Sequence, residues 1–259
     1  MLEIQNLSAR YPDSFALENI SLSIPQGAVT VIVGPNGCGK TTFLKALAGI
    51  LPASGSALLE GQELLSLDRR ELAKKVAFVP QNRQIPEITV GNLVLHGRFP
   101  YLSYPRRYRP EDHRIAWESM ARMGIEHLSD RNLVTLSGGQ RQKAYIAMAL
   151  AQNTPVVLMD EPNNFLDIAH QLQLMDHARA LATEGKTVVL VLHDLSMAMD
   201  CGDSLVVLWN GKCLFQGSPE EAFFSGNLDC AFGVKVCRVE TPQGWKYYFS
   251  AKNSRSSIV

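Results

Sequence analysis

The sequence predicts an α/β fold, and two observations carry that prediction. First, several short segments are continuously apolar and rich in β-branched residues, as strands buried on both faces of a sheet are. These segments are residues 29–33, 155–160, 187–193 and 204–209. Second, helical patterns stand between them, and buried strands that alternate with helices are typical of a parallel sheet flanked by helices. At 259 residues the chain is long enough for one large domain, or for a core with a smaller lobe.

Composition excludes several other classes of protein. Hydrophobic residues make up 46% and charged residues 19% of the chain, with 13 Pro and 19 Gly, so we expect neither disorder nor a collagen-like repeat. The 25 Lys and Arg balance 25 Asp and Glu, which is not the charge of a protein that coats nucleic acid. Apolar runs are far shorter than the roughly 20 residues that span a bilayer, and the first residues lack the pattern of a signal peptide. These features predict a cytosolic globular protein.

The cysteines predict neither a disulfide framework nor a metal site. They are odd in number and show no C-x-x-C pair and no Cys/His ligand spacing. We expect reduced thiols that serve as small buried hydrophobic residues. The five are Cys38, Cys201, Cys213, Cys230 and Cys237.

The first part of the chain predicts an antiparallel β subdomain followed by a strand–loop–helix unit. Residues 2–9 and 16–24 alternate apolar with polar side chains, which suits strands with one solvated face. The buried strand 29–33 then runs into a Gly-rich loop and a helix over 41–50. The pattern returns after residue 155, where a helix over 167–183 separates two buried strands.

A helical subdomain over about 82–152 is inserted into this α/β core. Strand patterns are missing from most of it, and helices are expected over 90–96 and 111–123. Between them lies a loop, 99–110, that is rich in Pro, Tyr and Arg.

The end of the chain predicts a small extension. We expect the core with its inserted subdomain to cover residues 1–225 and the extension to cover 226–259. From Gly233 onward the extension reads as a β-hairpin with its turn at 242–244, followed by a frayed end.

The Gly-rich loop matches the phosphate-loop pattern G-x-x-x-x-G-K-[ST], which predicts the core of a P-loop nucleoside triphosphatase. Glycines let backbone amides curl around phosphate oxygens, and the following helix directs the positive end of its dipole at them. Lys40 would neutralise the β- and γ-phosphates, and the Thr41 hydroxyl would ligate Mg²⁺. Cys38 fills a variable position and is given no redox role. The expected nucleotide-binding residues here are Gly34, Pro35, Asn36, Gly37, Cys38, Gly39, Lys40, Thr41 and Thr42.

Two acids follow one another at the end of a buried strand. Asp160 ends the apolar run 156–159 and would reach Mg²⁺ directly or through water. Glu161 points elsewhere and can polarise a water towards the γ-phosphate, as a general base does. Any buried strand followed by an acidic turn resembles this motif. The two acids therefore indicate a nucleotide site only in combination with the phosphate loop.

Residues 136–140, Leu-Ser-Gly-Gly-Gln, predict a second anion-binding helix terminus. Ser137 is placed to cap a helix over 140–152, and Gly138 and Gly139 expose the amides of its first turn. An ordinary Ser-Gly-Gly turn has the same pattern, but this one stands about one helix and one strand before Asp160. At this point the chain resembles the ATP-binding cassette (ABC) family, whose signature motif is this pentapeptide, and the resemblance extends over about residues 1–225.

The resemblance implies roles for three further residues. Tyr11 matches the aromatic residue that stacks on adenine, with plain strand packing as the alternative. Gln81 matches the glutamine that senses Mg²⁺ and the attacking water. His193 matches the switch histidine that contacts the γ-phosphate. With Glu161, the resemblance thus implies Gln81 and His193 as catalytic residues.

The loop after the two acids fits the family in part. Asp167 matches the family's aspartate there and is counted among the nucleotide-binding residues. Asn163 and Asn164 depart from the commoner Thr-Ser or Thr-Asn, a difference that bears on communication between subunits and not on hydrolysis.

The family also implies a head-to-tail pair of cassettes, here a homodimer because one cassette is present. ATP with Mg²⁺ would lie between two subunits. Lys40 and the metal ligands Thr41, Asp160 and Gln81 come from one subunit. The other contributes its signature residues, which are Ser137, Gly138, Gly139 and Gln140. Closure of the pair would complete the electrostatic cage around the nucleotide.

A cassette alone does not decide what its ATPase drives. One expectation is a transporter subunit whose membrane spans belong to two separate permease chains. The alternative is a soluble ATPase of DNA repair or translation, whose relatives usually carry two cassettes or a long coiled-coil insertion. The short helical insertion without heptads favours the transporter. A phosphate-loop kinase does not account for residues 136–140.

Four stretches, 96–101, 109–112, 166–171 and 191–195, resemble the ATPases of bacterial metal-chelate importers. That resemblance implies uptake of a ferric siderophore or haem, with cobalamin, molybdate or another metal as alternatives. It further implies an extracytoplasmic binding protein and a peripheral place on the cytoplasmic face of the inner membrane. The arginine-rich loop 106–114 is either a solvated face or a surface for the permease or for anionic lipid. No nucleic-acid partner is expected.

Overall fold

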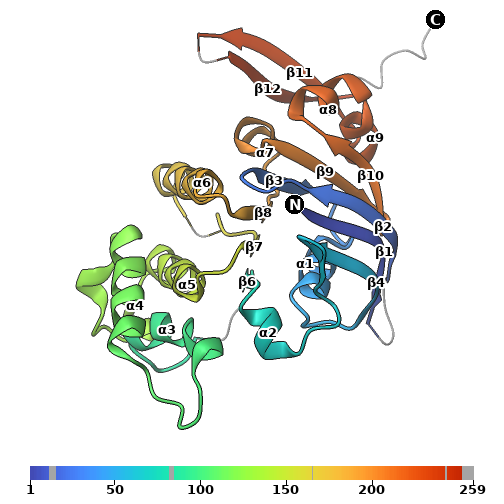
Figure 1. The fold of residues 1–259 in the computed structure, drawn as a ribbon. Coiled ribbons are helices and arrows are strands. Elements are labelled where there is room, and N and C mark those ends of the chain that lie inside the picture. Colours follow the sequence, from blue (N-terminus) through green and yellow to red (C-terminus); the bar gives the residue numbers. More distant parts are fainter. Residues whose placement is uncertain (12–15, 82–84, 165, 243, 253–259) are drawn as a thin grey trace, which may run out of the picture.

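The computed structural model describes residues 1–11, 16–81, 85–164, 166–242 and 244–252, and these residues form three sheets (Figure 1). The largest has six strands in the order β10-β9-β3-β8-β7-β6, all parallel to their neighbours except β10. A four-stranded antiparallel sheet has the order β2-β1-β4-β5, and β11 pairs with β12. The expected α/β fold with an antiparallel β part is confirmed.

The strands are β1 (Leu2–Arg10), β2 (Ala16–Ile24), β3 (Val29–Val33), β4 (Ala53–Leu59), β5 (Gln62–Glu63), β6 (Val76–Val79), β7 (Val156–Asp160), β8 (Thr187–Val191), β9 (Ser204–Trp209), β10 (Lys212–Gly217), β11 (Val234–Thr241) and β12 (Gly244–Ala251). The helices are α1 (Lys40–Leu47), α2 (Arg69–Ala73), α3 (Val90–His96), α4 (Pro110–Arg122), α5 (Gly138–Gln152), α6 (Ile168–Thr183), α7 (Leu195–Cys201), α8 (Pro219–Ser225) and α9 (Asn227–Phe232), and a 3₁₀ turn, η1, spans Phe99–Tyr101.

The three central strands bring their carboxyl ends to one edge of the large sheet. Every residue of β3, β7 and β8 is buried, as their apolar sequences predict. Val191 of β8 stands in register with Ile32 of β3 on one side and with Asp160 of β7 on the other. The loops after these strands therefore leave the sheet side by side, where ligands bind in open α/β sheets.

Alternate residues of the central strands supply two hydrophobic cores, because successive side chains of a strand point to opposite faces. Val31 and Val33 pack in the core that contains α5, α6 and α7. Ile32, between them, packs in the core formed with α1 and the antiparallel sheet. Figure 1 shows α5 and α6 on one side of the central strands and α1 on the other.

Some elements lack the patterns from which strands and helices were predicted. Strand β4 reads Ala-Ser-Gly-Ser-Ala-Leu-Leu, without β-branched residues, and β6 has only four residues. Their pairing with β1 and β7, which are distant in sequence, decides their conformation. The short strands β5 and β10 and the helices α2, α7, α8 and α9 were likewise not expected.

The helical subdomain contains the helices expected from the sequence, with shifted ends. Helix α3 has the predicted bounds and α4 begins one residue earlier than predicted. Helix α5 begins at Gly138 and not at Gln140, because Ser137 caps it directly. The three helices share one core, in which Val94 and Met120 lie with Ile146. In Figure 1, α3 and α4 (green) lie at the opposite end of the molecule from β11 and β12 (red).

The predicted hairpin near the carboxyl terminus is present as β11 and β12. It follows helix α9, which the sequence did not indicate, so the extension is not a hairpin alone. The guanidinium of Arg238 lies 4.0 Å from the centre of the Trp245 ring, and Lys246 Nζ reaches Asp200 of α7 at 2.7 Å. The frayed end predicted for residues 253–259 lies outside the described residues.

The cysteines are all free. Cys38 and Cys201 are buried, and burial raises the pKa of the Cys201 thiol to about 12. Cys213 and Cys237 are half-buried and Cys230 is exposed, so the expectation of burial is wrong for Cys230.

Within the described ranges, we find no helix that combines the length and the apolar character needed to cross a membrane.

Candidate nucleotide-binding and catalytic site

The loop between β3 and α1 wraps around the ammonium group of Lys40. This side chain is buried, and its Nζ donates to the carbonyl oxygens of Gly34 at 2.8 Å and Pro35 at 3.1 Å. Gly37 and Gly39 have φ values of 77° and 107°, which glycine adopts without strain. An ammonium group has three protons, so these two bonds leave one for a phosphate oxygen.

The carboxylate of Asp160 lies near Thr41 and is buried without a hydrogen bond. Asp160 is 1% exposed, and neither carboxylate oxygen has a partner among the described residues. Burial raises the pKa of Asp160 above its ordinary value and outweighs the neighbouring Thr41 hydroxyl, which acts in the opposite direction. An unpaired buried carboxylate is costly. With the Thr41 oxygen it offers the hard ligands that Mg²⁺ prefers, so these residues fit that ion.

Three side chains from separate segments hold the carboxylate of Glu161. Gln81 Nε2 and Asn164 Nδ2 donate to Oε2, the latter at 2.8 Å, and His193 Nε2 contacts Oε1. The backbone of Glu161 has a φ of 49°, a costly conformation for a residue other than glycine. A hydrogen bond from its N–H to Val191 O, at 3.1 Å, holds that conformation against β8.

A pocket of about 470 Å³ brings the phosphate loop and the Glu161 cluster together. Its lining comprises Tyr11, Asn36, Gly37, Gly39, Lys40, Thr41, Thr42, Gln81, Glu161 and His193. Tyr11 is positioned by Lys45, whose Nζ donates to the tyrosine hydroxyl at 3.2 Å. Four residues expected at this site, all in the described part of the chain, do not belong to the lining. They are Gly34, Pro35, Cys38 and Asp160.

The signature residues line a different pocket, of about 490 Å³. Ser137 Oγ accepts from Gln140 N at 3.2 Å and Gln140 Oε1 accepts from Ser137 N at 3.1 Å, a reciprocal cap of α5. Gly138, Gly139 and Asp167 lie in the same lining. Asp167 caps α6 by accepting from His170 N at 2.9 Å. The structure thus groups these residues together and assigns them to a pocket other than that of Lys40.

Two contacts of the site were not predicted. Asn164, noted only as a departure from the family pattern, donates to Glu161, and the turn Asn164 N to Glu161 O at 3.2 Å brings the two side chains together. A side-chain amide three residues after an acid, in a turn that contains proline, is the sequence pattern from which this contact could have been predicted. Gln142 of α5 donates to Pro162 O at 2.8 Å, linking the signature helix to the same turn, and nothing local in the sequence marks that contact.

Gly34→Ala is expected to destabilise the chain and to abolish nucleotide binding. A Cβ at residue 34 would collide with the backbone oxygen of Leu208 and with Cys38 Sγ. Overpacking of this kind costs about 1–3 kcal/mol. Thermal unfolding and binding of a fluorescent ATP analogue measure the two effects. Gly185→Ala is the control for binding, because a Cβ there meets no atom within 4 Å; its φ of 85° makes the substitution strained, so it should lower stability and yet leave nucleotide affinity unchanged. Normal nucleotide binding by Gly34→Ala would contradict the geometry of the loop.

The fold and this site together define a phosphate-loop nucleotide-binding protein. The family model described as "ABC transporter" matches residues 17–164, more than half of the chain, and the chain belongs to this family of ATPases. It is similar to the petrobactin import ATP-binding protein FpuD of Bacillus anthracis, with 39% identity over 93% of this chain and 89% of that protein. It is also similar to the ferric enterobactin transport ATP-binding protein FepC of Escherichia coli K12, with 39% identity over 92% of this chain and 89% of FepC.

Solved structures show the same architecture. A metal-chelate type ABC transporter in an inward-facing conformation matches with a TM-score of 0.83 and 25% identity, over 98% of both chains. The cassette MJ0796, in a post-hydrolysis state bound to ADP and phosphate, matches with a TM-score of 0.74 and 28% identity, over 85% of this chain and 99% of that one.

Proposed function

We propose that this ABC ATPase is the ATP-hydrolysing subunit of a bacterial importer for metal chelates. The observation that carries the catalytic part of the proposal is the position of Glu161. Its carboxylate lies in the lining of the phosphate-loop pocket, where Gln81, Asn164 and His193 hold it. A candidate base that is fixed beside the place for the γ-phosphate is what hydrolysis of ATP requires.

Each group of the pocket has a task that suits its position. Lys40 and the amides of the loop bind the β- and γ-phosphates, and Tyr11 packs on the adenine. Glu161 accepts the proton of the attacking water, while Gln81 and His193 orient that water and the γ-phosphate. Thr41 and Asp160 would hold Mg²⁺, with Gln81 as a further ligand. When bound, the ion offsets the negative charge of the phosphates.

The signature residues suit a head-to-tail homodimer. Because they line a pocket other than that of Lys40, a second subunit is needed to bring them to the nucleotide. The capped start of α5 directs backbone amides outward, and such a helix terminus binds anions. The dimeric structure of MJ0796, which matches this chain with a TM-score of 0.74 and 28% identity, supports such pairing.

Iron chelates are the substrates that the relatives support best. FpuD is named for petrobactin import and FepC for ferric enterobactin transport, and both match this chain over about nine tenths of its length. We infer that two permease subunits and an extracytoplasmic binding protein complete the transporter, with this chain at the cytoplasmic face of the inner membrane. Haem, cobalamin and molybdate are the competing substrates.

The purified transporter, with its permease and binding protein, should show ATP hydrolysis that rises several-fold when the binding protein carries a ferric siderophore. The measurement is phosphate release in proteoliposomes, with ferric siderophore, haem, cobalamin, molybdate, a sugar and an amino acid tested in parallel, each with a binding protein that carries it. The binding protein without a ligand is the control. Stimulation only by a sugar or an amino acid would overturn the metal-chelate proposal, and a stable complex with DNA or ribosomes in place of a permease would overturn the transporter.

A further inference from the structure

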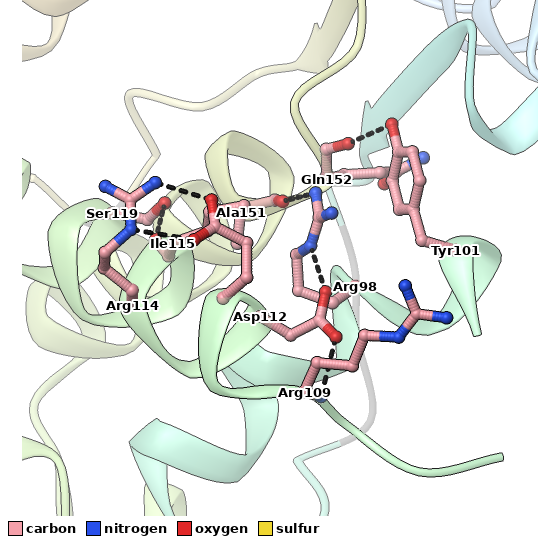
Figure 2. A network of polar contacts seen from close by, with 10 residues as sticks. Arg98, Tyr101, Arg109, Asp112, Arg114, Ile115, Ser119, Ala151 and Gln152 are labelled. Carbon is pink, nitrogen blue, oxygen red and sulfur yellow. Dashed lines mark hydrogen bonds and ion pairs between the residues drawn. The ribbon is translucent and has the colours of Figure 1, made fainter.

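Side chains of the helical subdomain enclose the C-terminal end of α5. A helix leaves its last carbonyl oxygens without partners inside the helix. Here Arg98 Nη1 donates to Ala151 O and Tyr101 Oη donates to Gln152 O, both at 2.9 Å. Figure 2 shows both side chains reaching this end of the helix. A guanidinium group at a helix C-terminus also meets the negative end of the helix dipole, so the contact is favourable in two ways.

Arg98 is buried and held from several sides. The Arg98 side chain is 9% exposed and that of Asp112 is 8% exposed, and Arg98 Nε lies 3.0 Å from Asp112 Oδ1. The guanidinium carbon lies 4.0 Å from the centre of the Tyr101 ring. Asp112 Oδ2 accepts from Arg109 N at 2.9 Å, at the start of α4 (Figure 2). Burial opposes ionisation of Asp112, but the Arg109 amide and the Arg98 guanidinium together bring its pKa below the ordinary value, so the pair is charged.

The same helix end is fastened to the α/β core. Gln152 Nε2 donates to Ala73 O of α2 and to Val76 O of β6, the second at 3.0 Å. Arg70 of α2 donates to Pro100 O of η1 at 2.9 Å. Three elements of the junction, α2, β6 and η1, are therefore tied to one another where α5 ends.

The angle of helix α5 at this junction determines where the signature residues at its other end lie. Its 15 residues extend over about 22 Å, so a tilt of about 5° at the C-terminal end moves Ser137 by about 2 Å. A hydrogen-bond donor displaced by that distance no longer reaches its acceptor. A small change in the angle of α5 at this junction therefore moves Ser137 to Gln140 by more than a hydrogen bond tolerates.

We propose that Arg98, with Asp112 and Tyr101, is a positioning residue for the signature sequence. The guanidinium fixes the angle of α5, and through it the place where Ser137 and Gln140 meet the nucleotide held by a second subunit. None of these three side chains lines either pocket, so they act through α5 and touch no substrate. The inference rests on the proposed head-to-tail dimer.

The test replaces the buried pair without leaving a lone charge. Arg98→Met/Asp112→Asn removes the cap of α5, while the asparagine oxygen can still accept from Arg109 N. In the Glu161→Gln background, ATP-driven dimerisation measured by analytical ultracentrifugation is expected to weaken at least about 10-fold, the scale of lost hydrogen bonds to a charged group. With Glu161 intact, kcat should fall by a similar factor. KM and the affinity of the monomer for an ATP analogue should change less than about twofold, because the phosphate-loop pocket is untouched.

A milder variant and a matched control complete the experiment. Tyr101→Phe keeps the ring against Arg98 and removes one neutral hydrogen bond, so we expect a stably folded protein whose dimerisation weakens about 3-fold. Arg114→Met makes the same type of change as Arg98→Met, on the helix α4 that carries Asp112, but at exposed ion pairs with Glu111 and Glu118, and should have no effect on dimerisation.

The outcomes separate this inference from the proposed function. Dimerisation and kcat like those of Arg114→Met, in both the double variant and Tyr101→Phe, would overturn the positioning role alone. A Glu161→Gln parent that does not dimerise with ATP would overturn the head-to-tail dimer, and the inference with it. A parallel fall in monomer nucleotide affinity and dimerisation would show general damage and would also overturn the positioning role.

Discussion

Glu161→Gln is expected to lower the turnover of ATP hydrolysis at least about 10²-fold and to leave ATP affinity unchanged. A glutamine has nearly the size of glutamate and keeps one oxygen for the donors Gln81 and Asn164. It cannot accept the proton of the attacking water. Because Lys40 and the loop are untouched, the phosphates should bind as before. Phosphate release under single-turnover conditions measures the first effect, and equilibrium dialysis with labelled ATP measures the second.

The matched control is Glu63→Gln. Glu63 is also a hydrogen-bonded carboxylate, which accepts from Ser56 Oγ and from the Ala57 amide, but it belongs to the antiparallel sheet and lines neither pocket. This change should leave the turnover of ATP hydrolysis within about twofold of that of the unsubstituted chain. A substitution outside the catalytic site can change the stability of the protein but does not change the groups that carry out the reaction. Near-normal hydrolysis of ATP by the Glu161→Gln variant would show that Glu161 is not the general base.

The sequence predicted the phosphate loop well because its chemistry is local. A buried strand, a glycine loop, Lys40 and a helix follow one another without interruption, so the pattern and the structure coincide. Ser137 was identified for the same reason, since a cap and its helix are neighbours in sequence. In each case one short segment contains both the group and the backbone that positions it.

The surroundings of Glu161 could not be predicted in this way. Gln81 donates to Glu161 across 80 residues of sequence, and only the pairing of β6 with β7 brings them together. Strand β6 itself has no pattern that distinguishes it from a short helix. The resemblance to the family supplied the expected roles of Gln81 and His193, whereas the contact between Asn164 and Glu161 is seen only in the fold.

The junction at the end of α5 shows the same limit. Arg98 belongs to a stretch that the sequence connected with a subfamily, but its partners Asp112 and Ala151 stand 14 and 53 residues away. Asp112 belongs to the arginine-rich stretch 106–114, for which the sequence predicts a solvated face or a docking surface, and the structure instead buries Asp112 beside Arg98. Composition cannot distinguish a buried ion pair from an exposed one, because both contain the same residues.

Asp160→Asn is expected to abolish Mg²⁺-dependent hydrolysis and yet to stabilise the protein in the absence of nucleotide. Asp160 is buried and its oxygens have no hydrogen-bond partner among the described residues, so the ionised form costs folding free energy. A neutral amide removes that charge. We expect a gain of at least about 1 kcal/mol in the free energy of unfolding, or roughly 2–4 °C in Tm. Hydrolysis should fall at least about 10²-fold, because the ligand for Mg²⁺ is lost.

The pH dependence of the free energy of unfolding tests whether the charge of Asp160 destabilises the folded protein. The folded-state pKa of Asp160 lies above its ordinary value of 3.8, so between these two values the folded protein binds more protons than the unfolded chain. The stability of the unsubstituted protein therefore falls as pH rises through this window, from 3.8 up to the raised pKa. The Asp160→Asn protein does not lose stability in this way. The difference in the free energy of unfolding between it and the unsubstituted protein should therefore grow across this pH window and stay constant above it. Urea unfolding at a series of pH values measures the difference.

Asp112→Asn provides the opposite case. Asp112 is also buried, but Arg98 and the Arg109 amide hold its pKa below the ordinary value, so removal of its charge should destabilise the protein. Mg²⁺ with ATP should raise the Tm of the unsubstituted protein and of Asp112→Asn, and should raise that of Asp160→Asn much less. An Asp160→Asn protein that is less stable than its parent at neutral pH, or that gains as much Tm from Mg²⁺ and ATP, would show that Asp160 is not the unpaired metal-binding carboxylate. The two substitutions are chemically identical, so opposite signs can arise only from what surrounds each carboxylate.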